Sequence, residues 1–244
     1  MTDHKIIGTG RTAEVYAWEA GKVLKLFIPG YPQSAVEKEF RLGQLLNTLN
    51  FPKPKAYEIV SWQNRSGIVY EHITGESLLA WVLRTMDVEG CATRLAALHP
   101  LIMQNQLEGL PSYKEFLRWG VEKATALSQT EREEALQQLK DLPEGNQLCH
   151  GDFHPGNILI HEGKSVVLDF MNVCKGPVLY DIARTVFLIQ YSQVPEPVPD
   201  LEALKAFQKA LADAYLQKLQ VRRDQLQPYL TVIAAARKGE APEE

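Results

Sequence analysis

The sequence has few cysteines and no motif that would pair them. Its three thiols, at Cys91, Cys149 and Cys174, are scattered, and none belongs to a C-x-x-C pair. Zinc ribbons and dithiol redox sites need such pairs, and an odd number of thiols does not suit a disulfide framework. We therefore expect three buried thiols without a chemical role, with Cys149 at the end of a core strand.

Long hydrophobic runs and blocks of positive charge are also missing. No apolar run approaches the length of a membrane span, and the start, Met1–Lys5, has no apolar signal region. We expect a cytoplasmic protein with no membrane partner. The 26 basic and 30 acidic residues give a net charge of −4 without a lysine or arginine cluster. No electrostatic footprint for nucleic acid exists, so we expect no nucleic-acid partner.

The pattern G-x-x-x-x-G-K-[ST] is absent, which excludes a P-loop nucleotide site. Glycines near the N-terminus form a different pattern, Gly8-Thr9-Gly10. A Rossmann loop would open a helix at this point. Here the next residues alternate as a strand, Val15–Trp18, then turn and continue as a second strand, Val23–Phe27. The alternation predicts a β-hairpin.

The 244-residue chain changes its hydrophobic period along its length. Short alternating strands dominate to about Tyr70, and helical spacing dominates from Leu78 onward. With 45% hydrophobic residues, the chain can form one or two compact lobes. The expected later elements are helices over Leu78–Leu98 with a break near Gly90, over Ser112–Leu142, Leu201–Leu219 and Leu226–Ala236, a proline-rich loop at Ser192–Asp200 and a disordered tail at Gly239–Glu244.

The most informative segment is Leu148–Ile160, which places Asp, His and Asn on a tight Gly/Pro loop between apolar runs. The next apolar run, Ser165–Leu168, delivers a second acid, Asp169. Phosphoryl transfer needs an acid to receive the proton of the acceptor hydroxyl, and an acid with an amide to hold magnesium against nucleotide phosphates. These residue types also favour plain turns, which is the alternative explanation. The complete pattern favours a catalytic role over a plain turn.

HGDFHPGN at residues 150–157, followed by LDF, resembles the catalytic signature of the aminoglycoside phosphotransferase and choline kinase superfamily, relatives of the protein kinases. The resemblance implies that Asp152 is the catalytic base and that Asn157 and Asp169 are magnesium ligands. His150 and His154 would then shape the loop.

The resemblance also implies an α+β, two-lobe protein-kinase-like fold. A small antiparallel-sheet N-lobe with the hinge would span residues 1–73, and a mostly helical catalytic and substrate-binding C-lobe would span 74–244. ATP or GTP would bind between the lobes with Mg²⁺. Gly8 and Gly10 resemble the kinase glycine-rich loop, with Ala13 at the third glycine, and Lys25 resembles the lysine that contacts the α- and β-phosphates.

That lysine needs a carboxylate to position it, and the next predicted helix offers Glu37 and Glu39. Ser34 and Glu37 fit a capping box, so Glu37 is expected to cap the helix. Glu39 falls on the stripe of Val36 and Phe40 that faces the sheet, where an acid needs a partner. Lys25 fits that role.

An apolar strand runs into Glu71, His72 and Ile73 and stops at Gly75. It resembles the hinge whose backbone binds the adenine edge. A simple strand-to-helix turn with Ser77 as the cap is the alternative.

After Asp169 the chain resembles the family's D-[FW]-x-x-x-x-x-G-x-x-x-x-D-[LI]-A, in which Asp181 would brace the catalytic loop. Capping of a helix alone could also explain Asp181. Pro177 and Val178 stand where the family often has Asp-Pro. His99 is expected at a helix C-terminus, where a histidine suits the helix dipole.

We predict an ATP- or GTP-dependent phosphotransferase that transfers the γ-phosphoryl group to a hydroxyl of a small molecule, such as an aminoglycoside, a choline-like amino alcohol or a related metabolite. Two alternatives stay open. A catalytically silent nucleotide-binding module would use the same fold, although the intact Lys25, Asp152, Asn157 and Asp169 argue against it. A protein kinase would need a long activation segment and an A-P-E motif, and neither is visible after Asp169.

Overall fold

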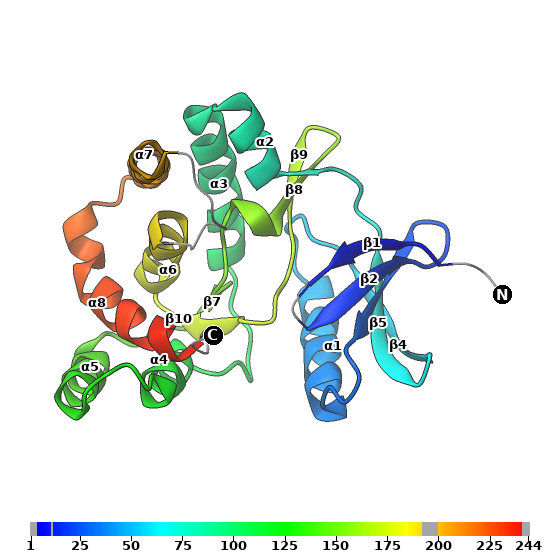
Figure 1. The fold of residues 1–244 in the computed structure, drawn as a ribbon, viewed down its shortest axis with the longest axis horizontal. Coiled ribbons are helices and arrows are strands. Elements are labelled where there is room, and N and C mark those ends of the chain that lie inside the picture. Colours follow the sequence, from blue (N-terminus) through cyan, green and yellow to red (C-terminus); the bar gives the residue numbers. More distant parts are fainter. Residues whose placement is uncertain (1–3, 11, 192–199, 241–244) are drawn as a thin grey trace. The chain divides into compact units, whose positions relative to one another are not determined.

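The computed structural model describes residues 4–10, 12–191 and 200–240. This part of the chain has an α+β fold, with an antiparallel sheet in the N-terminal part and helices in the C-terminal part (Figure 1). The residues form two compact units. One contains the described residues up to Glu76 together with Ile158–Met171, and the other contains Ser77–Asn157 and the described residues from Asn172 onward. The division at residues 73 and 74 stays a prediction, but residues 158–171 group with the N-terminal part.

The first unit is built on a five-stranded antiparallel sheet in the order β1-β2-β3-β5-β4. Its strands are β1 (Ile6–Thr9), β2 (Ala13–Ala17), β3 (Lys22–Phe27), β4 (Ala56–Trp62) and β5 (Arg65–Glu71). Helix α1 (Gln33–Asn47) packs on this sheet (Figure 1). The predicted hairpin is confirmed as β2 and β3, which pair from Ala13↔Phe27 to Ala17↔Val23.

The two faces of β3 have different surroundings because side chains alternate along a strand. Leu24 and Leu26 join one apolar cluster, whereas Phe27 packs in a second cluster with Val36 of α1. Lys25 points to the face opposite Leu24 and Leu26, as predicted, which is the face that α1 covers.

The predicted capping box at the start of α1 is wrong. The N-cap is Pro32, in an extended conformation and with no side-chain cap bond, so the helix starts at Gln33 and Ser34 already lies inside its first turn. A capping box requires the serine at the N-cap itself. Glu37 accepts a hydrogen bond from the Gln33 side chain at 3.2 Å instead.

A second sheet, in the order β6-β8-β9, contains β6 (Glu76–Ser77), β8 (Ile158–His161) and β9 (Lys164–Val167). The β8–β9 hairpin forms hydrogen bonds to other parts of the first unit. Val167 N–H donates to the Pro52 carbonyl at 3.1 Å, and His161 Nδ1 lies 2.6 Å from the Thr74 carbonyl oxygen. These contacts explain why the hairpin groups with the N-terminal part.

The second unit is mostly helical. Its core contains Leu95, Leu117, Tyr180, Tyr215 and Val232, all completely buried. Its elements are α2 (Leu78–Thr85), α3 (Val88–Met103), α4 (Tyr113–Lys123), α5 (Gln129–Asp141), β7 (Gln147–Cys149), the 3₁₀ turn η1 (Pro155–Asn157), β10 (Cys174–Gly176), α6 (Val178–Tyr191), α7 (Leu201–Leu219) and α8 (Arg223–Glu240). No helix in the residues described is long and apolar enough to cross a membrane.

Local helix signals are partly confirmed. Ser77 caps α2 by accepting the Ala80 N–H at 3.1 Å. The break predicted near Gly90 lies instead at Met86, whose backbone is left-handed, and Asp87, which caps α3 through the Gly90 N–H at 2.8 Å.

The predicted tail is wrong at Gly239 and Glu240, which belong to α8 because α8 packs against α4 and α6 (Figure 1). Residues 241–244 of that tail and residues 192–199 of the predicted loop lie outside the described residues, whereas Asp200 caps α7. The three thiols are buried, as predicted, and Cys149 ends β7.

Candidate active site

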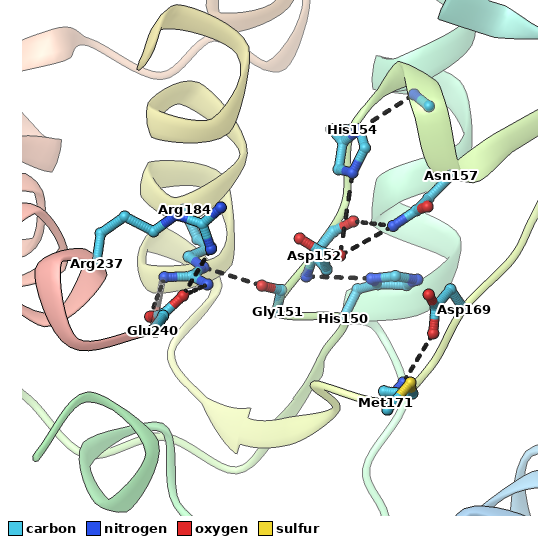
Figure 2. A network of polar contacts seen from close by, with 11 residues as sticks. His150, Gly151, Asp152, His154, Asn157, Asp169, Met171, Arg184, Arg237 and Glu240 are labelled. Carbon is cyan, nitrogen blue, oxygen red and sulfur yellow. Dashed lines mark hydrogen bonds and ion pairs between the residues drawn. The ribbon is translucent and has the colours of Figure 1, made fainter. Parts of the chain in front are cut away.

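The loop after β7 folds around the Asp152 carboxylate (Figure 2). Asn157, at the end of η1, donates its side-chain N–H groups to Asp152 Oδ2 at 3.1 Å and to the Asp152 backbone oxygen at 3.0 Å. This leaves the Asn157 carbonyl oxygen on the other side of the amide. The Asp152 side chain is 25% exposed, so its carboxylate is held from within and still reachable from outside.

Both histidines of the loop bind its backbone, which confirms that they shape it. His150 Nδ1 accepts the Asp152 N–H at 3.2 Å, and His154 Nδ1 accepts the Gly156 N–H at 3.1 Å. An accepting Nδ1 requires that the ring proton of a neutral imidazole sit on Nε2. In His154 this Nε2 faces Asp152 Oδ2 at 4.0 Å. The His154 ring therefore directs a donor toward the carboxylate.

Helix α6 forms hydrogen bonds to the peptide groups on both sides of Gly151. Asp181 accepts the N–H groups of His150 at 2.7 Å and Gly151 at 2.9 Å. Arg184 Nε donates to the Gly151 carbonyl at 3.0 Å (Figure 2). Asp181 and Arg184 lie three positions apart on one face of the helix. Gly151 has a φ of 74°, and a Cβ there would overlap the Asn172 carbonyl oxygen, so this position requires glycine.

Asp181 braces the loop after β7, and a capping role does not describe it, because it lies inside the first turn of α6 and is completely buried. Burial favours its neutral form, but His99 and the loop N–H groups outweigh that effect and hold the pKa of Asp181 below its usual value. The third bond to this carboxylate comes from His99 Nε2 at 2.9 Å, and His99 Nδ1 lies 2.5 Å from the Tyr215 hydroxyl.

The predicted place of His99 at a helix C-terminus is wrong. Helix α3 continues through Pro100 to Met103, so His99 lies inside it and is completely buried. Its partner is the Asp181 carboxylate rather than the end of a helix dipole. His99 also stacks on Phe153 of the loop, with ring centroids 4.0 Å apart.

Asp169 belongs to the first unit, two residues after the end of β9. It is exposed, and its φ of 57° is unusual for a residue other than glycine. Its Oδ1 accepts the Met171 N–H at 3.4 Å. Such backbone conformations concentrate at functional sites.

Lys25 and Glu39 form the pair that the sequence suggested, with Lys25 Nζ 2.8 Å from Glu39 Oε1. Their side chains are 18% and 12% exposed. The same oxygen accepts the Tyr70 hydroxyl at 3.0 Å. Burial and the Glu39 carboxylate raise the pKa of Tyr70 well above its usual value, so the hydroxyl stays a donor. Two donors thus fix one carboxylate oxygen.

In the glycine-rich segment, Gly8 lies within β1 and Gly10 directly follows that strand. Gly10 N–H donates to the Ala13 carbonyl at 2.8 Å. At Gly8 an added Cβ would lie 3.6 Å from Val15 Cβ, an ordinary contact. Packing inside the protein therefore does not require glycine at position 8.

In the predicted hinge, two of three backbone N–H groups already have acceptors. Glu71 N–H donates to the Lys55 carbonyl and His72 N–H to the Gly21 carbonyl, both at 2.9 Å. An adenine edge at this segment could therefore accept a hydrogen bond from Ile73 N–H or donate to a carbonyl. Adenine contacts at Glu71–Ile73 stay a prediction.

The oxygen donors Asn157 Oδ1 and the Asp169 carboxylate have the chemistry that Mg²⁺ prefers, since it takes one or two carboxylates and completes its shell with water and phosphates. Within residues 4–10, 12–191 and 200–240, no group of three or more His, Cys, Asp or Glu side chains could hold a metal ion. The assignment of Asn157 and Asp169 as magnesium ligands stays a prediction.

Sequence reasoning missed Tyr70 and Arg184. Tyr70 was detectable, because Ile68 pairs with Lys25 and Tyr70 lies two positions further on the same sheet face. Arg184 carried no comparable signal, since an arginine on an apolar helix normally reaches solvent.

Comparisons with known proteins are consistent with this geometry. The model of the phosphotransferase enzyme family matches residues 3–229. No curated protein matches the chain. Solved structures with a similar fold include an aminoglycoside-3′-phosphotransferase of type VIII, 17% identical, with a TM-score of 0.64 over 96% of this chain and 93% of that one.

Two further structures match at similar levels. An amicoumacin kinase in complex with AMP-PNP, Ca²⁺ and Ami is 16% identical, with a TM-score of 0.62 over 98% of this chain and 81% of that one. A macrolide 2′-phosphotransferase from Brachybacterium faecium is 18% identical, with a TM-score of 0.53 over 99% and 92%. At these identities the likeness establishes the fold.

Proposed function

Because this chain belongs to the phosphotransferase enzyme family, we propose that it transfers the γ-phosphoryl group of ATP or GTP to a hydroxyl of a small molecule. The observation that carries the proposal is the Asp152 carboxylate, which Asn157 fixes at 3.1 Å while the side chain stays 25% exposed. A group that orients a hydroxyl and accepts its proton must be both rigid and reachable.

Asp152 would direct the acceptor hydroxyl toward the phosphorus and take its proton as the bond forms. The transition state of phosphoryl transfer is loose, so little charge builds on the hydroxyl early, and placement contributes more than basicity. Asn157 would serve twice, since its N–H groups hold Asp152 while its carbonyl oxygen is left for the cation. Bound Mg²⁺ supplies charge neutralisation for the phosphates, and Asn157 Oδ1 and Asp169 would hold it.

On the nucleotide, Lys25 would contact the α- and β-phosphates. The two bonds to Glu39 Oε1 support this role, because they restrain a long side chain that would otherwise lose much conformational freedom on binding. Packing within the protein does not require glycine at position 8. The glycine there supports a close approach of nucleotide phosphates to the backbone of β1. Glu71, His72 and Ile73 would contact the adenine through the backbone.

The short segment between Asp169 and α6 favours a small-molecule acceptor over a protein. Only the three-residue strand β10 lies in this described segment, so it has no room for an activation segment. The similar structures are named for aminoglycoside, amicoumacin and macrolide substrates. We propose these antibiotics and choline-like amino alcohols as the first acceptor classes to test. We also propose that the protein acts in the cytoplasm and has no nucleic-acid or membrane partner.

The test is Mg²⁺-dependent consumption of ATP and GTP by the purified protein. The acceptor panel contains aminoglycosides, macrolides, choline, ethanolamine, homoserine, sugars and nucleosides, and Asp152→Asn is the control. Turnover that depends on an acceptor and is lost in the variant supports the proposal. Calorimetric binding of magnesium nucleotide without turnover on any acceptor would favour the silent module, and phosphorylation of a protein panel alone would favour a protein kinase.

A further inference from the structure

Helix α8 ends in a carboxylate that is almost completely buried. The Glu240 side chain is 8% exposed, although it is the last described residue of the chain. Its two oxygens accept from the terminal nitrogens of Arg184 at 2.7 and 2.6 Å, and Oε2 also accepts from Arg237 at 2.9 Å (Figure 2). Burial opposes the charge on Glu240, but the hydrogen bonds from Arg184 lower its pKa. The paired carboxylate is therefore ionised at neutral pH.

This pairing sets the plane of the Arg184 guanidinium. A bidentate arginine–carboxylate pair is planar, so it fixes the direction of the remaining donor as well. That donor, Nε, lies 3.0 Å from the Gly151 carbonyl oxygen, and the Arg184 side chain is completely buried. Without Glu240 the guanidinium would carry an unpaired buried charge and would have to move toward water.

The end of α8 is packed closely enough to place Glu240 with little freedom. A Cβ on Gly239 would overlap the Gly120 carbonyl oxygen of α4, and a Cβ on Gly120 would lie 2.7 Å from the Ala236 carbonyl oxygen. The two helices therefore meet backbone to backbone at two glycines, and Glu240 follows directly.

The Gly151 carbonyl belongs to the peptide group whose nitrogen is that of Asp152. Arg184 holds the oxygen of this peptide, and the His150 ring holds its N–H at 3.2 Å. Rotation of the peptide plane would turn the Asp152 backbone and redirect its carboxylate. The orientation of Asp152 thus depends on a chain of contacts that starts at Glu240.

We propose that Glu240 is a positioning residue for phosphoryl transfer, which acts through Arg184 on the peptide before Asp152. This inference rests on the proposed function. The family match ends at residue 229, so Glu240 lies outside the part of the chain that it describes.

The experiment compares Glu240→Gln with Asp224→Asn, which removes one carboxylate from the same helix where it pairs with Arg222 at the surface. For each we would measure kcat, the KM for nucleotide, urea unfolding, and hydrogen exchange of the amides at residues 150–152. A third variant, Arg184→Met with Glu240→Leu, removes the buried charges together, a change that proteins often tolerate. We expect this variant to fold while lacking the donor to Gly151.

We expect Glu240→Gln to lower kcat about tenfold to a hundredfold with an unchanged nucleotide KM, because a misplaced catalytic group loses turnover rather than binding. Exchange at residues 150–152 should quicken, and the double variant should be equally slow. Asp224→Asn should match the wild type. If Glu240→Gln is unfolded, the double variant decides the question.

A kcat within about twofold of the wild type in folded Glu240→Gln, or wild-type kcat in the double variant, would overturn the inference. If the wild type itself turns over no acceptor, the proposed function has failed, and hydrogen exchange still tests the contact chain. In that case, unchanged exchange at residues 150–152 refutes it, and faster exchange confined to them supports it.

Discussion

Replacement of Asp181 by asparagine should strongly destabilise the second unit, although the two side chains have the same shape. The Asp181 carboxylate is completely buried and accepts three hydrogen bonds, from His150 N–H, Gly151 N–H and His99 Nε2. An amide has one acceptor oxygen where the carboxylate has two. Its NH₂ group must therefore face a donor that previously faced oxygen.

The geometry sets the size of the loss. His150 and His99 share Oδ2, and Gly151 uses Oδ1, so the better orientation keeps the amide oxygen toward the first two. Its NH₂ group then meets the Gly151 N–H, which leaves two buried donors without an acceptor. Each such donor costs about 1–3 kcal/mol, so we expect a total loss of about 2–6 kcal/mol. Domains have only about 5–15 kcal/mol of stability in total.

Urea unfolding followed by tryptophan fluorescence measures this loss. With a slope of about 1–3 kcal/mol per molar urea, the midpoint of Asp181→Asn should fall by about 1 M or more. Asp224→Asn is the matched control, since Asp224 is exposed and should change stability by no more than about 0.5 kcal/mol. If the Asp181→Asn midpoint fell no further than that of the control, the network would not be a main support of the loop.

Three other outcomes are expected. Glu39→Gln should raise the nucleotide KM by about tenfold, and Tyr70→Phe by less because it keeps the ion pair; equal KM values in both variants and the wild type would contradict this. Gly151→Ala should lower the melting temperature further than Gly163→Ala, because both glycines have positive φ but only the first lacks space for a Cβ; equal losses would remove the steric argument. The folded-state pKa of Glu240 lies below its ordinary value of 4.5, where the unfolded chain binds the proton more readily. Its stability contribution is present above about pH 4.5 and is lost as the pH falls through the folded pKa, so the melting temperatures of wild type and Glu240→Gln should converge there. If the difference in melting temperature between wild type and Glu240→Gln stayed constant from pH 7 to pH 3, the predicted direction of the pH dependence would be refuted.

Patterns within about ten residues were enough to predict the sheet hairpin and a tight loop in Leu148–Ile160, whereas the loop-shaping role of His150 and His154 came from the family resemblance. In β2 and β3 the two-residue alternation fixes which face each side chain occupies, so the side of Lys25 could be inferred. In the loop, the partners of Asp152 and His154 lie within five residues along the chain. Local spacing therefore carried the information.

Contacts across long stretches of sequence could not be predicted in this way. Asp181 meets His99 at a separation of 82 residues, and Arg184 meets Glu240 at 56. The terminal position of Gly239–Glu244 suggested disorder, since the last residues of a chain are ordered only where contacts hold them. Glu240 is ordered because it pairs with Arg184, a buried arginine on another helix. The composition of the C-terminal segment does not reveal that partner. The capping-box prediction failed for a local reason. Pro32 is the N-cap of α1, so Ser34 lies inside the helix and cannot cap it.

The two carboxylates proposed for catalysis are anchored very differently. Asp152 follows a peptide that Arg184 and His150 hold at both ends, and Asn157 bonds directly to its side chain. Asp169 is exposed, stands in a left-handed conformation, and accepts the Met171 N–H at 3.4 Å, near the limit for a hydrogen bond. A group that aligns a neutral hydroxyl gains from rigidity before the substrate arrives. A ligand of a cation that enters with the nucleotide can take its final position when the charge is present, because the cation then supplies the attraction that orients it. The contrast in anchoring is therefore what we expect if the cation and the nucleotide bind together.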